Sequence, residues 1–193
     1  MPTWRQSLSV KAGAENVLVD DFTESEYFDF YNRLINNQRL IGAAKKDGYS
    51  ICFMPHPGIK RNGLKFFHKD PNVKFLGFDY TYRDVYAWAD LVMTDYSSSV
   101  MDFALLRKPV VYCQFDKKEF FESHIYTQGY YDYEKDGFGE VTYDMDSCIN
   151  VMIRYMENGC KVHEPYGSRM DKFFGFHDKS NCKRVYERIK MIK

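Results

Sequence analysis

The sequence predicts an α/β fold in which a parallel sheet is flanked by helices. Between about residues 49 and 115, short apolar runs alternate with segments of helical periodicity. This alternation is typical of parallel strands joined by right-handed crossovers. The aromatic content is high, with 16 Tyr, 16 Phe and 2 Trp, which favours one well-filled core. We therefore expect residues 1–193 to form a single domain.

The first predicted helix covers about residues 24–46. Thr23 and Glu26 form a capping-box pattern, apolar residues then recur at helical spacing, and Gly48 is a natural C-terminal stop. The expected elements that follow are a strand within 49–58, a strand at 72–78, a helix at 82–89, a strand at 90–94, a helix at 98–107 and a strand at 108–115.

The remaining third is less regular. Residues 116–140 mix aromatic, charged and glycine residues without a clear period, which predicts a long loop with at most one short helical turn. Asp144 is expected to cap the next helix, and two closing helices are predicted at 167–176 and 180–192.

Charge and cysteine patterns exclude several classes of protein. Lys plus Arg and Asp plus Glu both total 27, so no charge excess draws the chain to nucleic acid. The five cysteines are widely spaced and lack a C-x-x-C pair, and no histidines have metal-ligand spacing, so we predict neither disulfides nor a metal site. No stretch reaches the roughly 20 apolar residues that cross a membrane, and a reducing cytoplasm fits best.

The motif TDYSSSVMDFALLRKPV at residues 94–110 is the most informative. Here the chain leaves a predicted strand, passes Asp95 and enters a predicted helix, with Ser97, Ser98 and Ser99 around its first turn. Hydroxyls and unpaired backbone N–H groups at such a place could bind a phosphate. The alternative is an ordinary turn in which Asp95 or Ser97 only caps the helix.

Two further residues are candidates for a functional role. His56 stands between two prolines, so its imidazole projects from a stiff strand end and could donate to a phosphate oxygen or act as an acid or base. A structural loop histidine is the alternative. Asp102 is expected to anchor the serine loop or to face solvent. Glycine-rich nucleotide loops and a G-x-S-x-G elbow are absent, so the serines are interpreted as binders, not nucleophiles.

Four segments together resemble the CDP-glycerol glycerophosphotransferase family, the teichoic-acid-type polymerases and primases. They are PTWR (2–5), MPHPG (54–58), ADLVMTDYSSSVMDFALLRKPVVYCQFD (89–116) and FFGFHDKSNCKRVYERI (173–189). The resemblance implies a GT-B architecture of two Rossmann-like domains that face a cleft. This chain then corresponds to the C-terminal, donor-binding half of a longer enzyme.

The resemblance also implies roles for individual residues. His56, Ser97 and Ser98, with Ser99 beside them, would grip the pyrophosphate of a CDP-alcohol such as CDP-glycerol or CDP-ribitol, and Asp95 would support the loop. An acceptor hydroxyl would attack the β-phosphorus and release CMP. His56 would stabilise the departing phosphate, and its protonated form is expected to serve better than the neutral one.

The same resemblance places the catalytic base outside this chain. In the family the proposed base is a histidine in a W-H-G motif of the N-terminal domain, whereas here Trp4 and Trp88 are followed by Arg5 and Ala89. The chain alone is therefore expected to be inactive. The polymer or lipid-linked acceptor would bind the N-terminal domain, and the full-length enzyme would lie at the inner face of the cell membrane.

Two segments depart from the family pattern, and two other functions stay open. GFGE (137–140) stands where the family has a proline-glycine-proline turn, and HDK (177–179) stands where it has HDG. A GT-B glycosyltransferase that uses a CMP- or UDP-sugar could carry the same histidine and serines. A non-catalytic nucleotide-binding module is the other alternative.

Overall fold

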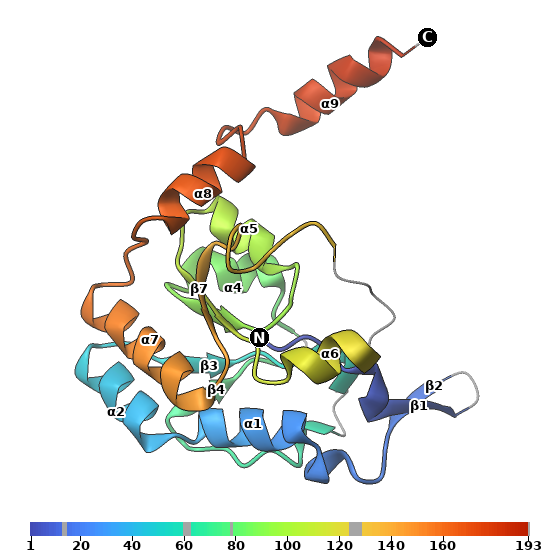
Figure 1. The fold of residues 1–193 in the computed structure, drawn as a ribbon, viewed down its shortest axis with the longest axis vertical. Helices are drawn as coiled ribbons and strands as arrows, with labels where there is room; N and C mark the ends of the chain where they lie inside the picture. The colour runs from blue at the N-terminus through green and yellow to red at the C-terminus, as the bar shows by residue number, and fades with distance from the viewer. Residues whose placement is uncertain (13–14, 60–62, 78, 124–128, 193) are drawn as a thin grey trace.

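Strands and helices alternate through most of the chain in the computed structural model, which describes residues 1–12, 15–59, 63–77, 79–123 and 129–192 (Figure 1). The strands are β1 (Ser9–Ala12), β2 (Glu15–Leu18), β3 (Ile51–Phe53), β4 (Val73–Phe75), β5 (Val92–Thr94), β6 (Val110–Cys113) and β7 (Gly139–Thr142). The helices are α1 (Glu26–Ile35), α2 (Gln38–Lys46), α4 (Tyr82–Trp88), α5 (Val100–Leu105), α6 (Lys117–Ser123), α7 (Met145–Glu157), α8 (Tyr166–Phe173) and α9 (Asn181–Lys190). Short 3-10 turns cover Gln6–Leu8, Phe22–Glu24 and Pro57–Ile59.

The strands of the core are parallel, as predicted. β3 pairs with β4, and β5, β6 and β7 form a second parallel group in that order. The N-terminal segment lies beside β5, because the Met1 amine donates to the Met93 carbonyl at 2.9 Å and the Thr94 hydroxyl donates to the Met1 carbonyl at 2.5 Å. This segment leads directly from the sheet to Arg5.

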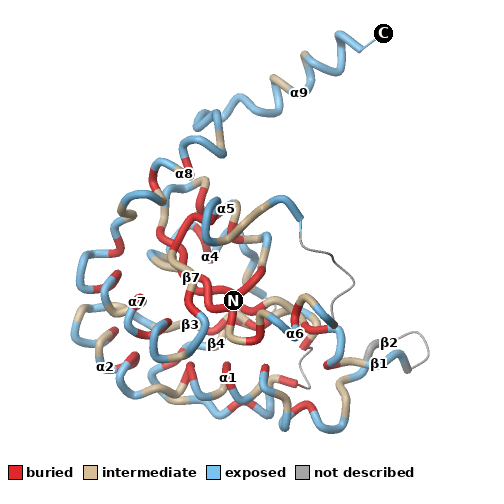
Figure 2. The backbone as a smooth tube through the Cα atoms, viewed as in Figure 1, coloured by how far each residue is buried: buried red, intermediate tan, exposed pale blue. Residues whose placement is uncertain are grey.

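Helices cover both faces of the sheet. Along β6, Val110 and Tyr112 join one apolar cluster while Val111 and Cys113 join the other, as the two-residue period of a strand requires. The first face is covered by α4 and α5, and the second by α1, α2 and α7 (Figure 1). Buried residues concentrate along the strands between these layers (Figure 2).

The prediction of one continuous helix at 24–46 is wrong. The chain forms two helices, because Asn37 caps α2 by accepting hydrogen bonds from the backbone N–H groups of Arg39 and Leu40, each at 3.1 Å. The predicted cap is also wrong. Ser25, not Thr23, caps α1 and accepts the N–H of Phe28. Several short polar side chains can cap a helix, and Thr23 and Ser25, two positions apart, are both residues of this kind.

Two other predicted boundaries need correction. The expected loop at 116–140 contains α6 and the first residues of β7, although residues 124–128 of it lie outside the described part of the chain. The helix expected at 98–107 begins only at Val100, so the serines precede it. The hairpin of β1 and β2 was not predicted, because SVKA and ENVL mix polar and apolar residues without an apolar run.

Several expected features are confirmed. Asp144 caps α7 through the N–H of Ser147 at 2.8 Å. The closing helices are present as α8 and α9, but α9 has no buried residue and projects from the body (Figure 2). Lys108, which follows α5, donates to three carbonyls at the end of α4 and so satisfies groups that a helix leaves unpaired.

Candidate functional site

The candidate site lies where several parallel strands end. His56 follows β3, Asp95 follows β5, and Asp116 follows β6. Arg5 reaches the same edge from the N-terminal segment beside β5. Ligands of open α/β sheets bind outside the carboxyl ends of the strands, so this edge is where a ligand site is expected.

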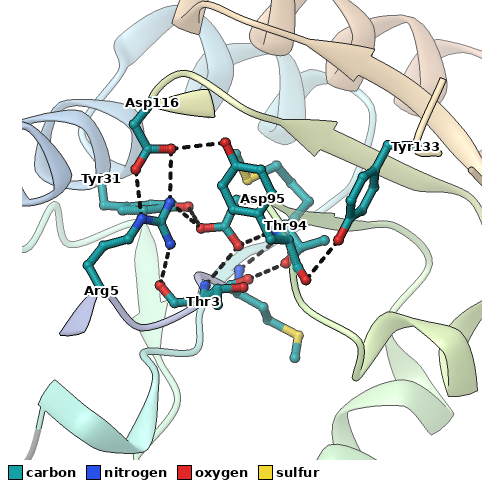
Figure 3. A network of polar contacts seen from close by, with 10 residues as sticks. Thr3, Arg5, Tyr31, Thr94, Asp95, Asp116 and Tyr133 are labelled. Atoms are coloured by element: carbon teal, nitrogen blue, oxygen red, sulfur yellow. Dashed lines mark hydrogen bonds and ion pairs between the residues drawn. The ribbon is translucent and has the colours of Figure 1, made fainter. Parts of the chain in front are cut away.

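Arg5 is the centre of a buried polar network (Figure 3). Its guanidinium makes a two-bond contact with Asp116, with Nε to Oδ2 at 2.6 Å and Nη2 to Oδ1 at 3.0 Å. Nη2 also lies 2.9 Å from Oδ2 of Asp95, and Nη1 donates to the Thr3 carbonyl. Its planar face packs over the Phe120 ring at 4.7 Å. Arg5 therefore ties the loops after β5 and β6 to the N-terminal segment.

The partners of Arg5 stabilise the positive charge of its guanidinium. Burial tends to lower the pKa of the guanidinium, but the nearby Asp95 carboxylate and the hydrogen bonds to Asp116 together raise that pKa above its ordinary value. Two carboxylates and one guanidinium leave a net negative charge in this network. All three nitrogens of the Arg5 guanidinium contact protein oxygens, so Arg5 is not a free anion ligand.

Asp95 is a structural anchor of the serine loop. It is completely buried and accepts the backbone N–H groups of Thr3 at 2.8 Å and Tyr96 at 2.6 Å, and the Tyr31 hydroxyl at 2.9 Å (Figure 3). Together with Arg5 these donors fill the roughly four lone-pair sites of a carboxylate. The prediction that Asp95 supports the loop agrees with this geometry, whereas direct contact with a pyrophosphate does not.

The serines form a compact turn before α5. The hydroxyls of Ser97 and Ser99 lie 2.7 Å apart, and the Tyr86 hydroxyl donates to Ser99 Oγ at 3.1 Å. Ser98 is exposed, and its hydroxyl has no hydrogen-bond partner among the described residues. Neither Asp95 nor Ser97 caps α5, because the N-cap position is Ser99 and it makes no side-chain cap bond. Ser97 Oγ accepts the backbone N–H of Ser99 at 3.4 Å, so Ser97 closes the turn ahead of α5 but does not cap the helix itself.

The serine turn is held from two sides. Asp95 fixes its start, and the Tyr133 hydroxyl donates to the Tyr96 carbonyl at 3.0 Å (Figure 3). Asp102 does not contribute to this support. It is exposed on α5 and makes no hydrogen bond or ion pair within the described residues, so of its two expected roles the solvent-facing one agrees with the structure and the anchoring one does not.

His56 is held in a defined orientation. Its Nδ1 accepts the backbone N–H of Gly58 at 3.0 Å, and its ring stacks on Trp4 with centroids 6.1 Å apart. A Cβ at Gly58 would lie 2.9 Å from the Trp4 ring and 3.1 Å from His56 Nδ1, so glycine is required there. The accepted bond puts the proton of the neutral ring on Nε2. No described residue hydrogen-bonds to Nε2, so this N–H can donate to a ligand.

Burial favours the neutral form of His56. Burial lowers the pKa of the imidazole below 6.5, and the Asp95 charge opposes this only in part. Protonation would also place a proton on Nδ1 and cost the bond from Gly58. The neutral ring with an Nε2–H donor is therefore favoured near pH 7, whereas the protonated form is the one that the sequence analysis expects to serve better beside a departing phosphate.

Sequence reasoning missed two residues of this site. Arg5 stands in the PTWR segment and Asp116 at the end of the long middle motif, but neither was predicted as a site residue. Their pairing spans 111 positions, which no local pattern reveals.

Across the described ranges, no three His, Cys, Asp or Glu side chains gather as a metal site would require. The five cysteines are free. Among the same residues, no helix is both long enough and apolar enough to span a lipid bilayer.

The fold has a known counterpart. The structure of the wall teichoic acid polymerase TagF is similar with a TM-score of 0.63 at 19% identity, and the match covers 97% of this chain and 41% of that chain. This likeness confirms the predicted fold class, a Rossmann-like α/β sheet that is flanked by helices as in one half of a GT-B fold. At this level of identity it speaks for the fold alone.

Sequence comparison defines the family. The CDP-glycerol:poly(glycerophosphate) glycerophosphotransferase family matches residues 1–191, and the chain belongs to this family of transferases of teichoic acid biosynthesis. The minor teichoic acid biosynthesis protein GgaB of Bacillus subtilis is 39% identical over 98% of this chain and 21% of its own length. A teichoic acid glycerol-phosphate transferase of Staphylococcus aureus is 23% identical over 97% of this chain and 43% of its own length. The chain thus spans less than half of these relatives.

Proposed function

We propose that this chain is the donor-binding domain of an enzyme that transfers polyol phosphate from a CDP-alcohol to an acceptor hydroxyl in teichoic-acid-like polymer synthesis. The family match over residues 1–191 carries this proposal. The donor would be CDP-glycerol or CDP-ribitol. Relatives named for glycerol phosphate and for ribitol phosphate both match this chain. The ribitol-phosphate polymerase TarL of Staphylococcus aureus is 27% identical over 80% of this chain and 26% of its own length.

In this proposal the pyrophosphate of the donor binds between the loops after β3 and β5. Support comes from His56 Nε2 and the Ser98 hydroxyl, two donors without partners among the described residues. Ser97 and Ser99 would extend the contact by exchanging their mutual hydrogen bond for bonds to phosphate oxygens. The buried network around Arg5 and Asp95 would hold the serine turn rigid, which lowers the entropic cost of binding.

The reaction would be an in-line displacement. An acceptor oxygen forms a bond to the β-phosphorus, the bond from that phosphorus to the oxygen of CMP breaks, and CMP leaves with the electron pair. Neutral His56 would donate a hydrogen bond from Nε2 to the oxygens on which negative charge develops. Such donors, fixed in advance, stabilise the transition state more than the ground state.

The proton of the acceptor hydroxyl would be accepted by a group of a separate domain, because this sequence has no W-H-G motif. The polymer or lipid-linked acceptor would bind that domain as well. The proposed enzyme is cytoplasmic and works at the inner face of the cell membrane. On this view the chain by itself binds donor without turning it over.

Calorimetric titration with CDP-glycerol and CDP-ribitol tests the assignment. His56→Ala and Ser98→Ala each remove one donor to phosphate, so each should weaken binding about tenfold, or about 1.4 kcal/mol. Asp102→Ala is the matched control, since Asp102 is exposed on α5 without polar contacts in the described chain and should leave the affinity unchanged. Unchanged affinity in both His56→Ala and Ser98→Ala would show that the site assignment is wrong.

Competition identifies the donor class. UDP-sugars and CMP-sugars should compete with CDP-glycerol only weakly, because the proposed donor is a CDP-alcohol. If a nucleotide sugar binds more tightly than both CDP-alcohols, the chain serves a glycosyltransferase and the proposed reaction is wrong. CMP itself should bind as the leaving group, more weakly than the intact donor.

A further inference from the structure

The serine turn receives a hydrogen bond from a helix that precedes it in the chain. Tyr86 of α4 donates its hydroxyl proton to Ser99 Oγ at 3.1 Å, and Ser99 Oγ lies 2.7 Å from Ser97 Oγ. The backbone N–H of Ser99 also donates to Ser97 Oγ at 3.4 Å. The three hydroxyls form a chain that begins in the apolar cluster under α4 and α5 and ends in the turn after β5.

The number of protons in this chain determines what the turn offers to a ligand. A hydroxyl carries one proton and accepts through two lone pairs. Because the Tyr86 proton lies between Tyr86 and Ser99, the Ser99 proton points into the turn. A single proton bridges Ser97 and Ser99, so the other serine proton is left to donate. When a phosphate oxygen replaces that bridge, both serine protons become donors to the anion.

Tyr86 is held as a fixed donor. Its side chain is buried, its ring packs on Phe103 with centroids 5.3 Å apart, and Lys108 Nζ donates to its backbone carbonyl at 2.9 Å. Burial raises the pKa of the phenol to about 12, so the hydroxyl keeps its proton at neutral pH. Within the described residues, the bond to Ser99 is the one hydrogen bond that this hydroxyl makes.

We propose that Tyr86 is a positioning residue of the donor site, which orients and polarises the Ser99 hydroxyl so that Ser97 and Ser99 donate to the pyrophosphate. The inference rests on the proposed function, since the pyrophosphate is the anion that this turn would hold. A hydroxyl that accepts a hydrogen bond is a stronger donor in its own next bond. Tyr86 would thus act on the ligand through Ser99 and not by direct contact.

The competing role for Tyr86 is packing alone, and Tyr86→Phe separates the two roles. This variant keeps the ring on Phe103 and removes only the donor to Ser99. Tyr82→Phe is the matched control, because Tyr82 lies one turn earlier on α4, is 36% exposed and makes no hydrogen bond through its hydroxyl in the described chain. The same atom is removed from the same helix in both variants.

Calorimetric titrations of the full chain with inorganic pyrophosphate and with CDP-glycerol test the proposal. Tyr86→Phe should weaken the binding of both ligands about fivefold, whereas Tyr82→Phe should leave both affinities unchanged. Because Tyr86 acts through Ser99, Tyr86→Phe should cause no further loss when it is added to Ser99→Ala. Unchanged affinity in Tyr86→Phe, or losses that add in the double variant, would overturn the positioning role.

The two ligands also separate this inference from the proposed function. Pyrophosphate has neither nucleoside nor alcohol, so it reports on the serine turn alone. If His56→Ala weakens CDP-glycerol binding but Tyr86→Phe weakens neither ligand, the role of Tyr86 is wrong and the donor site stands. If Tyr86→Phe weakens pyrophosphate binding while a nucleotide sugar binds more tightly than CDP-glycerol, the proposed function is wrong and the role of Tyr86 stands. A chain that binds neither ligand would overturn both.

Discussion

Arg5 has the largest predicted effect of any single side chain. It is buried between Asp95 and Asp116, so Arg5→Met would leave two buried carboxylates without their cation. Removing one member of a buried ion pair typically costs about 3–5 kcal/mol. We expect a loss of that size in the free energy of unfolding, measured by urea denaturation.

Arg33 is the matched control for this prediction. It pairs with Asp29 on the surface of α1, and both side chains are more than half exposed. Surface pairs contribute little, so Arg33→Met should change the free energy of unfolding by less than about 0.5 kcal/mol. Similar losses in the two variants would mean that the Arg5 network is not a structural anchor.

Site residues that stand in local motifs could be predicted from the sequence, whereas those paired over a long sequence distance could not. His56 and the serines stand in short motifs with a local reason, a proline-fixed loop and a polar turn after a strand. Arg5 and Asp116 acquire their roles only when the N-terminal segment reaches the end of β6. Asp102 shows the converse, since a carboxylate near the motif is exposed when the helix turns it outward.

The pH dependence of His56 follows from its lowered pKa. Because the folded-state pKa lies below 6.5, the unfolded state binds the proton more readily in this range. The contribution of His56 to stability is therefore complete above pH 6.5 and is lost as the pH falls through the folded-state pKa. An NMR titration should give a midpoint below 6.5 and, at neutral pH, the Nε2–H tautomer. A midpoint above 6.5 would contradict the burial argument.

At the scale of elements, the pairing of β6 and β7 depends on Gly139. A Cβ at Gly139 would lie 1.7 Å from the Val110 carbonyl oxygen, which is backbone and cannot move without disturbing the ladder. Gly139→Ala should therefore destabilise the chain by at least about 2 kcal/mol, as overpacking and lost strand pairing do. Urea denaturation measures the change.

Gly42 provides the opposite outcome for the same substitution. It lies inside α2, and no atom stands within 4 Å of a Cβ built there. Alanine is favoured over glycine in a helix by about 0.5–1 kcal/mol, so Gly42→Ala should stabilise the chain by that amount. A loss at Gly42, or no loss at Gly139, would contradict these assignments.

Gly139 also explains why β7 was not predicted. The run GEVT has one apolar side chain, Val141, and follows Gly137 closely, so it resembles a loop until β6 is beside it. Long, periodic segments such as α7 were predicted with their caps, because amphipathic spacing and Asp144 are local signals. The break between α1 and α2 was missed because both halves keep apolar spacing, while the choice to stop depends on Asn37.

At the scale of the molecule, the C-terminal segment from residue 176 is energetically separate from the body. α9 has no buried residue, and Val185, Tyr186 and Ile189 on it are each about 60% exposed. Its described polar contacts are local, such as those of Arg184 with Asp178 and Asn181. Unfolding free energy and the m-value both follow the surface that folding buries, so this helix adds little to either.

Deleting residues 176–193 should therefore change the free energy of unfolding by less than about 1 kcal/mol and leave the urea midpoint nearly unchanged. A deletion that starts at 164 is the contrast, because it also removes α8. Met170 of α8 is completely buried in the cluster that contains Phe138, and loss of such a side chain costs about 2–5 kcal/mol. If the shorter deletion costs as much as the longer one, α9 is part of the cooperative unit. If only the longer one does, the folded body ends with α8, and the apolar face of α9 contributes nothing to it.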